Sequence, residues 1–430
     1  MRVTGWRCAV CAAEVDIAAP LPWRCPNSTT GDRRHVLQIV DDPGASVVDA
    51  PAPDANPYLR HDGDLAWAAY ADSNGIDLAA RRQLVTELDD AVRGVAGVGF
   101  VPTPCGRSDE LSDALGFAEG GGVWVKDETG GVGGSQKARH LFTILLHLRA
   151  AEILGHLTER PPLAIASCGN AALAAAMLAR AADWPIDVYV PTWMSDGFGD
   201  ELDRLGARTH RCERRAGDPA GDPAMLRFRE AVAAGAFPFT VQGPENALAL
   251  DGGRTLGWEI GERLADQHVG ELDRIFVQVG GGAFATCVGA THPARRFHAV
   301  QAEGCAPLAL AWERARATSG TEPVAVADRW TELMTPWPDP HSLADGILDD
   351  ETYDWIGVFG ALIGTGGAPI VAPEHLVADA NQLAVDAGFD VSLTGSAGLA
   401  GLLHERRGHA DGSGILPDER VAVVMSGVRR

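Results

Sequence analysis

The chain has 430 residues, of which 46% are hydrophobic and 22% charged, a composition typical of a folded globular protein. Its formal net charge of -22 would repel phosphate groups, so we expect no nucleic-acid partner. No apolar run is long enough to span a bilayer, and the N-terminal residues lack a signal-peptide pattern. We therefore expect a cytoplasmic protein with no membrane partner, long enough for two or three domains.

The first forty residues predict a small metal-binding module. Cys8 and Cys11 form a C-x2-C pair, and Cys25 and His35 follow as two further candidate ligands. Cysteine and histidine are the usual ligands of structural zinc, although a complete zinc ribbon expects a second C-x2-C pair. Residues 1–40 are therefore predicted to be a zinc-ribbon-like module. The alternative is a small buried hairpin with free thiols.

Residues 41–100 are predicted to contain a linker followed by helices. The stretch 41–57 is rich in Asp, Pro and Ala, and the acidic amphipathic pattern at 78–93 predicts a helix. Beyond residue 101, short apolar runs alternate with alanine-rich helical runs. Strands are expected at 162–167, 186–190, 208–212, 274–279, 297–302 and 421–425, and helices at 171–182 and just before Gly206. This alternation predicts parallel sheets with helices on both faces.

The chain contains only two lysines, Lys126 and Lys137, against 34 arginines (36 basic residues minus two). A lysine can lose its proton and attack a carbonyl, whereas an arginine stays protonated. Lys137 follows a glycine-rich loop and begins a predicted helix, so we interpret it as a Schiff-base lysine. The alternative, an exposed lysine in the first turn, is disfavoured by the helix dipole. Lys126 ends a predicted strand and is interpreted as a structural ion pair with Asp127, Glu128 or another acid.

A triple glycine follows the predicted strand at 274–279. Gly280, Gly281 and Gly282 precede a predicted helix that starts near Ala283. Successive backbone N–H groups and a helix N-terminus together suit an anion such as phosphate. The spacing fits neither a Rossmann fingerprint nor a Walker loop, so a nucleotide-binding function has little support. A tight turn is the alternative.

Two further loops follow predicted strands. In the loop SCGN, from Ser167 to Asn170, the N–H groups of residues 168–171 suit a carboxylate. The alternative is capping of the next helix by Asn170 or Ser167. Cys168 has no neighbouring His or Asp signature and is not interpreted as a nucleophile. The last loop holds Ser426. Active-site residues collect in loops at the carboxyl ends of strands, so we expect these loops to converge.

Together the motifs resemble the fold type II enzymes of pyridoxal 5'-phosphate (PLP), the group of tryptophan synthase β, threonine synthase and threonine dehydratase. GSQK resembles the family's G-S-x-K, which implies that Lys137 is the catalytic lysine and carries the cofactor. SCGNAA resembles the family's S-S-G-N loop, and VVMSG matches the segment whose serine bonds the pyridine nitrogen. The resemblance implies substrate binding by Ser167, Cys168, Gly169, Asn170 and Ala171, and cofactor binding by Lys137, Asn170, Gly280, Gly281, Gly282, Ala283, Phe284 and Ser426. The neutral hydroxyl of Ser426 would leave the pyridine nitrogen largely unprotonated.

Three further segments are closest to the threonine synthase branch: DGGRTLGWEI from Asp251, VQAEGCAPL from Val300 and SLADGI from Ser342. The resemblance begins at about Phe100 and implies an α/β fold with two parallel-sheet domains and the active site between them. Within 101–430, a smaller subdomain is expected at about 145–245 and a larger domain in the remainder. A small amino-acid substrate and a homodimer are also implied. Some threonine synthase-like proteins carry a zinc ribbon in front, as the N-terminal cysteines suggest here.

Departures from the family leave the reaction open. Gln136 replaces an aromatic residue, and the tripeptide 138–140 replaces the usual Asp/Arg-Gly. We expect a PLP-dependent lyase that eliminates or replaces a group at Cβ or Cγ, resembling threonine synthase or a dehydratase/ammonia-lyase. The alternatives are a β-replacement synthase, similar to cysteine or tryptophan synthase, and a non-catalytic regulatory protein. A phosphohomoserine substrate would need extra phosphate-binding groups, for which Arg139 and His140 are candidates.

Overall fold

The computed structural model describes residues 2–29, 34–42, 56–219, 221–318, 320, 323–408 and 414–430. The chain divides into two compact units: the first is Met1–Val101, Gly131–Gly133 and Lys137–Gly252, and the second is Pro102–Gly130, Gly134–Gln136 and Gly253–Arg430. The predicted segments 1–40 and 41–100 and the region 145–245 all fall in the first unit. Most of the expected linker, residues 43–55, lies outside the described residues. Within the described ranges, no helix has the length and apolar character needed to cross a membrane.

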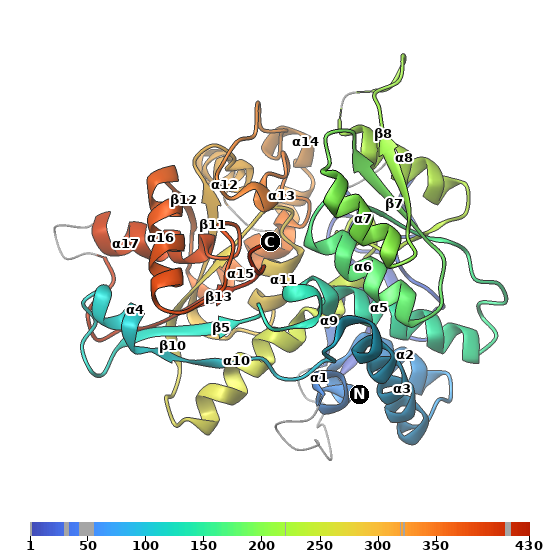
Figure 1. Ribbon diagram of the computed structural model, residues 1–430, viewed down its shortest axis with the longest axis horizontal. Helices are drawn as coiled ribbons and strands as arrows, with labels where there is room; N and C mark the ends of the chain where they lie inside the picture. Colours follow the sequence, from blue (N-terminus) through green and yellow to red (C-terminus); the bar gives the residue numbers. More distant parts are fainter. Residues whose placement is uncertain are drawn as a thin grey trace. The chain divides into compact units, whose positions relative to one another are not determined.

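The first unit contains two sheets (Figure 1). An antiparallel sheet of order β2-β1-β3 is built from β1 Val3–Cys8, β2 Glu14–Asp16 and β3 Leu37–Asp41. A parallel sheet of order β8-β7-β6-β9 is built from β6 Leu163–Ala166, β7 Ile186–Pro191, β8 Arg208–Cys212 and β9 Phe237–Pro238. The strands expected at 162–167, 186–190 and 208–212 are thus confirmed.

The helices of the first unit are α1 Pro57–Arg60, η1 Asp62–Asp64, α2 Ala66–Ser73, α3 Leu78–Ala96, α5 Lys137–Ile153, α6 Asn170–Ala181, α7 Asp196–Arg204, α8 Pro223–Ala233 and α9 Ala249–Gly252. Local sequence sets several of their ends. Asp77 caps α3 by accepting from the N–H of Ala80 at 2.8 Å, and Gly97 ends it with φ 77°. Helix α5 is buried on almost every side because α2, α6 and α9 pack against it.

The second unit contains a six-stranded sheet of order β12-β11-β10-β13-β5-β4 (Figure 1). Its strands are β4 Cys105–Ser108, β5 Gly122–Asp127, β10 Leu272–Gln278, β11 Ala294–Ala302, β12 Pro369–Ala372 and β13 Arg420–Met425. All neighbouring strands are parallel except β4, which pairs antiparallel with β5. The expected parallel sheets are therefore confirmed, with the antiparallel edge strand β4 as an addition that the sequence did not predict. A strand at the edge of a parallel sheet can pair antiparallel with its single neighbour. The sequence of β4, CGRS, has no apolar run from which this strand could have been predicted.

The helices of the second unit are α4 Asp109–Ala114, α10 Arg254–Asp266, α11 Ala283–Gly289, α12 Pro307–Thr318, α13 Pro323–Ala327, α14 Trp330–Leu333, η3 Asp345–Ile347, α15 Trp355–Thr365, α16 Glu374–Asp386 and α17 Ala397–Gly408; the 3-10 turn η2 Val132–Gly134 bridges the two units in sequence. Helix α17 packs against β10 to β13, and α16 packs against α17. Their contacts form a buried apolar core that includes Phe276, Val300, Val423 and Leu402. This core holds the ends of β10 and β13, from which two of the predicted site loops emerge.

Candidate functional site

Lys137 is the first residue of α5 and is half-buried, so it is not the exposed first-turn lysine of the alternative interpretation. Two neighbours fix the start of this helix. The hydroxyl of Tyr58 donates to the carbonyl of Arg139 at 2.9 Å. A Cβ added at Gly252 would lie only 2.0 Å from the same carbonyl oxygen, so only glycine allows this approach. The first turn that presents Lys137 is therefore held against α1 and α9.

His140, one turn into α5, is buried and neutral. Its Nδ1 lies 2.8 Å from the carbonyl oxygen of Ala249. Burial lowers the pKa of His140 to about 4, opposed by that hydrogen bond. An uncharged ring committed to the backbone is a poor phosphate ligand, which argues against the phosphate-binding role considered for this residue. Arg139 is also buried, with 4% of its surface exposed.

The loop SCGN connects β6 to α6 in the first unit. Gly169 occupies the N-cap position of α6 and provides no side-chain cap, and Asn170 is the first helical residue. The hydroxyl of Ser167 accepts from the N–H of Gly169 at 3.3 Å, which lies before the helix. Neither residue thus holds the N-cap position proposed in the alternative interpretation, and the bond of Ser167 stays within the loop. The positive end of α6 instead coincides with Gly169, which has no side chain.

The triple glycine connects β10 to α11 in the second unit. Gly282 has φ 96°, a left-handed conformation directly before the right-handed helix. This alternation directs consecutive N–H groups to one side of the loop, as in anion-binding turns. Packing also demands glycine here, because Cβ atoms at Gly280 and Gly282 would lie 2.5 Å from Asp349 and 2.9 Å from Thr352. Tight packing and an anion-binding backbone thus both account for this sequence. The next two residues, Ala283 and Phe284, are buried.

Ser426 follows β13 and is 5% exposed. Its Oγ accepts from the backbone N–H of Gln136 at 3.2 Å and donates to the side-chain Oε1 of the same residue. Gln136 is 7% exposed and belongs to the second unit with Ser426. Sequence reasoning assigned no role to Gln136. The one signal was its replacement of an aromatic residue immediately before Lys137.

Lys126 lies at the end of β5 with 1% of its side chain exposed. Its Nζ donates to the carbonyl of Thr103 at 2.9 Å and to Oε2 of Glu259 at 2.5 Å. Glu128 lies 3.9 Å from the same ammonium group and accepts from the hydroxyl of Thr103. The interpretation of Lys126 as a structural ion pair is therefore confirmed. Its main partner, Glu259, is 133 residues away in sequence and was not predicted.

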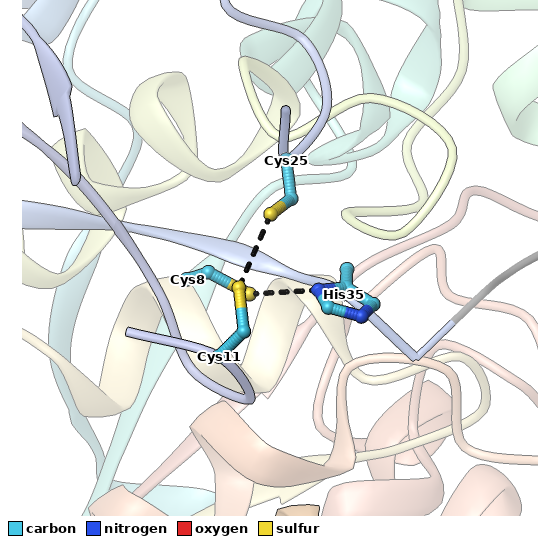
Figure 2. Close-up of side chains that lie close together, drawn as sticks. All are labelled: Cys8, Cys11, Cys25 and His35. Atoms are coloured by element: carbon cyan, nitrogen blue, oxygen red, sulfur yellow. Dashed lines mark hydrogen bonds between the residues drawn. The ribbon is translucent and has the colours of Figure 1, made fainter. Parts of the chain in front are cut away.

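The N-terminal cysteines and His35 converge at one end of the antiparallel sheet (Figure 2). Cys8 ends β1 and pairs with Leu37 of β3, which brings His35 beside it. The Nδ1 of His35 lies 3.4 Å from the Sγ of Cys8, and the Sγ atoms of Cys11 and Cys25 are 3.6 Å apart. The four ligand atoms all lie within 4.8 Å of one another. A tetrahedral zinc site with ordinary bond lengths requires ligand separations of roughly 3.5–3.8 Å. The Cys8–His35 and Cys11–Cys25 separations of 3.4 Å and 3.6 Å are close to this range, and the 4.8 Å limit for the whole set exceeds it.

The three thiols differ in acidity. Burial alone would raise the pKa of Cys11, but hydrogen bonds from the backbone of Ala13 and from the side chains of Asn27, Cys25 and Cys8 lower it to about 6. Burial raises the pKa of Cys25 to about 12 and also raises that of Cys8. One thiolate at neutral pH gives a metal ion an initial ligand, and metal binding then lowers the pKa of the others. The hairpin alternative describes β1 and β2 correctly but does not explain why four ligand atoms meet.

The predicted site residues fall on both units. Lys137 and the loop 167–171 belong to the first unit, and residues 280–284 and Ser426 belong to the second. Within the units, the structure brings together the four candidate metal ligands, and it brings Ser426 to Gln136.

Several solved structures share the fold. The diaminopropionate ammonia lyase from Escherichia coli superposes with a TM-score of 0.60 at 16% identity, covering 81% of this chain and 88% of that one. The threonine deaminase isoform 2 from Solanum lycopersicum superposes with a TM-score of 0.59 at 18% identity. The match covers 82% of this chain and 91% of that one. Maize serine racemase superposes with a TM-score of 0.57 at 17% identity. The match covers 80% of this chain and 93% of that one. At these identities the likeness shows the fold alone.

No curated protein matches the sequence. The family described as "Pyridoxal-phosphate dependent enzyme" matches residues 98–427, which is well over half of the chain. This range contains the lysine loop, the SCGN loop, the triple glycine and Ser426. The chain therefore belongs to the pyridoxal-phosphate dependent enzyme family, with the fold type II architecture.

Proposed function

We propose that the protein is a PLP-dependent lyase that eliminates or replaces a group at Cβ or Cγ of a small amino acid, with Lys137 as the cofactor-bearing and catalytic lysine. It would resemble threonine synthase or a dehydratase/ammonia-lyase. Similar folds include a threonine deaminase and an ammonia lyase, which supports the lyase class. They also include a serine racemase and an O-acetylserine sulfhydrylase, so β-replacement is the second candidate.

The main support for this proposal is that the chain contains only two lysines. PLP attaches to its enzymes through a lysine amine, and this chain offers only Lys126 and Lys137. Lys126 is buried and ion-paired with Glu259. Its amine would have to leave a buried carboxylate without its partner, which is costly. Lys137 is therefore the lysine available to the cofactor.

The residues of the first unit fit this chemistry. When bound, PLP provides an electron sink for negative charge at the substrate's Cα. Tyr58 and Gly252 hold the first turn of α5, which fixes the backbone of Lys137, and the amine of this lysine would take a proton from that carbon. The SCGN loop would bind the substrate carboxylate through backbone N–H groups at the N-terminus of α6.

The residues of the second unit also fit. The left-handed Gly282 before α11 provides the backbone arrangement that binds an anion, here the cofactor phosphate. Ser426 would bond the pyridine nitrogen from the end of β13. No charged side chain is needed for either role.

Chemical trapping tests the assignment of the lysine. The protein would be loaded with PLP, treated with borohydride to make the lysine–cofactor bond permanent, and mapped by mass spectrometry. We expect the adduct on Lys137, its loss in Lys137→Ala, and its retention in Lys126→Met. An adduct on Lys126, or none on loaded protein, would refute the proposal.

A substrate panel tests the reaction. The holoprotein would be mixed with amino acids that carry a hydroxyl, amino, acetoxy or phosphate leaving group at Cβ or Cγ. Release of ammonia with a 2-oxoacid indicates elimination, and consumption of an added thiol or indole indicates β-replacement. Racemisation without either product would contradict the lyase assignment. Absence of all three would favour a non-catalytic regulatory protein.

We also propose that Cys8, Cys11, Cys25 and His35 bind a structural zinc ion. The separations of their ligand atoms support a tetrahedral site, and Cys11 supplies a thiolate near neutral pH. Metal analysis of purified protein is expected to give one zinc per chain. A Cys212→Ser variant is a suitable control, because that buried thiol lies outside the cluster. Equal metal content in wild type and a Cys11→Ser/Cys25→Ser double variant would contradict the site.

A further inference from the structure

The N-terminal module is hydrogen-bonded to the segment that leads into α9. Cys25, one of the four candidate metal ligands (Figure 2), lies two residues after Trp23. The backbone carbonyl of Trp23 accepts a hydrogen bond from the N–H of Ala247 at 2.8 Å. The indole ring of Trp23 also meets the ring of Phe237 in β9 edge-on, with the ring centroids 6.4 Å apart. The chain beside this metal ligand is therefore anchored to the segment that carries α9.

Residues 246–252 connect that anchor to the start of α5. The carbonyl oxygen of Ala249 lies 2.8 Å from the ring Nδ1 of His140. The N–H of Gly252 donates to the hydroxyl of Thr143 at 3.0 Å. Both contacts fall in the first two turns of α5, whose first residue is the proposed cofactor lysine. All of these residues belong to the first unit, as does the N-terminal module.

Two buried side chains restrict the movement of residues 246–252. Asn246 donates to the carbonyl of Pro238 at 2.6 Å and accepts from the N–H of Leu248 at 3.0 Å. Asp251 accepts from two N–H groups at the start of α2, at 2.9 Å and 3.1 Å. A close-packed segment that is held in this way transmits a displacement from one end to the other.

We infer that metal binding by the N-terminal module braces the helix start that carries Lys137, so that metal loading raises the affinity of the protein for PLP. The inference rests on the proposed function, in which the module holds zinc and Lys137 holds the cofactor. When the metal is bound, Cys25 and the nearby carbonyl of Trp23 are held in place, and residues 246–252 are held with them. Only molecules whose helix start is in place can attach the cofactor, and the apparent affinity falls with the fraction of such molecules.

The hydrogen bond at Ala247 sets the size of the expected effect. One such bond is worth about 1 kcal/mol, which changes an equilibrium about fivefold. Coupling between two sites is reciprocal, so PLP should tighten the binding of zinc by the same factor by which zinc tightens the binding of PLP. A module that stabilised only itself would produce neither change.

The test uses the full-length protein with zinc, after removal of zinc by a chelator, and after zinc is added back. Hydrogen exchange without PLP should be about fivefold faster at residues 246–252 in the metal-free protein, and added zinc should restore the original rate. Peptides that cover α6 and β7 show whether the unit remains folded, and their exchange should not change. Equilibrium dialysis should show about fivefold weaker PLP binding without zinc, and a competing chelator should show about fivefold tighter zinc binding in PLP-loaded protein.

Two variants serve as matched controls for the chelator. The Cys11→Ser/Cys25→Ser double variant should behave like the metal-free protein in exchange and in PLP binding. Cys212→Ser changes a buried cysteine outside the cluster and should behave like wild type.

Exchange at residues 246–252 that does not respond to zinc would overturn the inference. Equal PLP affinity with and without zinc would also overturn it, as would a zinc affinity that PLP does not change. Loss of protection in α6 and β7 would have the same consequence, because the metal would then hold the whole unit rather than this segment. A wild-type protein without zinc, or without a borohydride adduct on Lys137, would remove the proposed function and this inference together.

Discussion

Replacing Lys126 with methionine is expected to destabilise the second unit strongly while leaving cofactor attachment intact. Methionine has a similar length but no charge, so the change leaves the buried carboxylates of Glu259 and Glu128 without their ammonium partner. The side chains of these two acids are 3% and 1% exposed. Thr103 also loses the donor to its carbonyl oxygen.

The expected loss is large because neither carboxylate can reach water. Removing one partner of a buried ion pair typically costs about 3–5 kcal/mol. An exposed pair serves as the matched control. Arg295 and Glu271, 64% and 56% exposed, lie 2.7 Å apart, and Arg295→Gln should cost less than about 1 kcal/mol because solvent screens the pair. Each substitution removes one positive charge from an ion pair, so the difference between their losses of stability measures the effect of burial.

Urea unfolding followed by circular dichroism would measure both variants, and borohydride mapping would check cofactor attachment. Lys126→Met combined with Glu259→Gln should recover part of the loss, since the second change removes a buried negative charge that Lys126 no longer balances. A loss in Lys126→Met no larger than that of Arg295→Gln would refute the reasoning. Loss of the adduct on Lys137 in a folded Lys126→Met protein would contradict the separation of roles between the lysines.

Three further variants test other parts of the structure. Cys11→Ser should lower the zinc content and the thermal stability, measured by metal analysis and differential scanning calorimetry, because a folded metal site contributes its binding energy to folding. His147→Phe should flatten the fall in stability below pH 6.5. Burial lowers the pKa of His147 to about 3, so the unfolded chain takes up a proton first and stability is lost as the pH falls from about 6.5 toward 3. Stacking on Tyr70 at 4.1 Å should persist with phenylalanine. Gly252→Ala should cost about 1–3 kcal/mol, because the new methyl group meets the carbonyl of Arg139.

Each variant has a control or an outcome that contradicts it. Unchanged melting after removal of the metal by a chelator would argue against a structural role for the cluster. An unchanged pH profile in His147→Phe would mean that His147 is not the group responsible, since His140 and His298 also have pKa values lowered to about 4 by burial. Gly94→Ala is the matched control for Gly252→Ala. Gly94 lies on an exposed face of α3 with nothing within 4 Å of a new Cβ, so alanine there should stabilise by up to about 1 kcal/mol.

Much of the architecture was predictable because it depends on local pattern. The strand at 208–212 was placed at the same residues that form β8, and the helix expected at 171–182 is α6 within one residue. The helix follows from its alanine-rich sequence, whereas β8, with the sequence RTHRC, has no apolar run and was placed by the alternation of strands and helices around it. β4 was missed because CGRS has no apolar pattern, and it forms only because β5 offers it an edge. Homodimer formation remains a prediction.

The sequence by itself determined the candidate chemistry: two lysines, glycine and serine loops after strands, and a Cys/His set, all readable because each depends on residue type and spacing. It also determined the family. Only the tertiary structure decided how the side chains pair. Glu259 as the partner of Lys126, Gly169 as the N-cap of α6, and Gln136 as the acceptor for Ser426 all depend on contacts that no local pattern encodes. The last pair is separated by 290 residues, so only the folded chain brings its two side chains together.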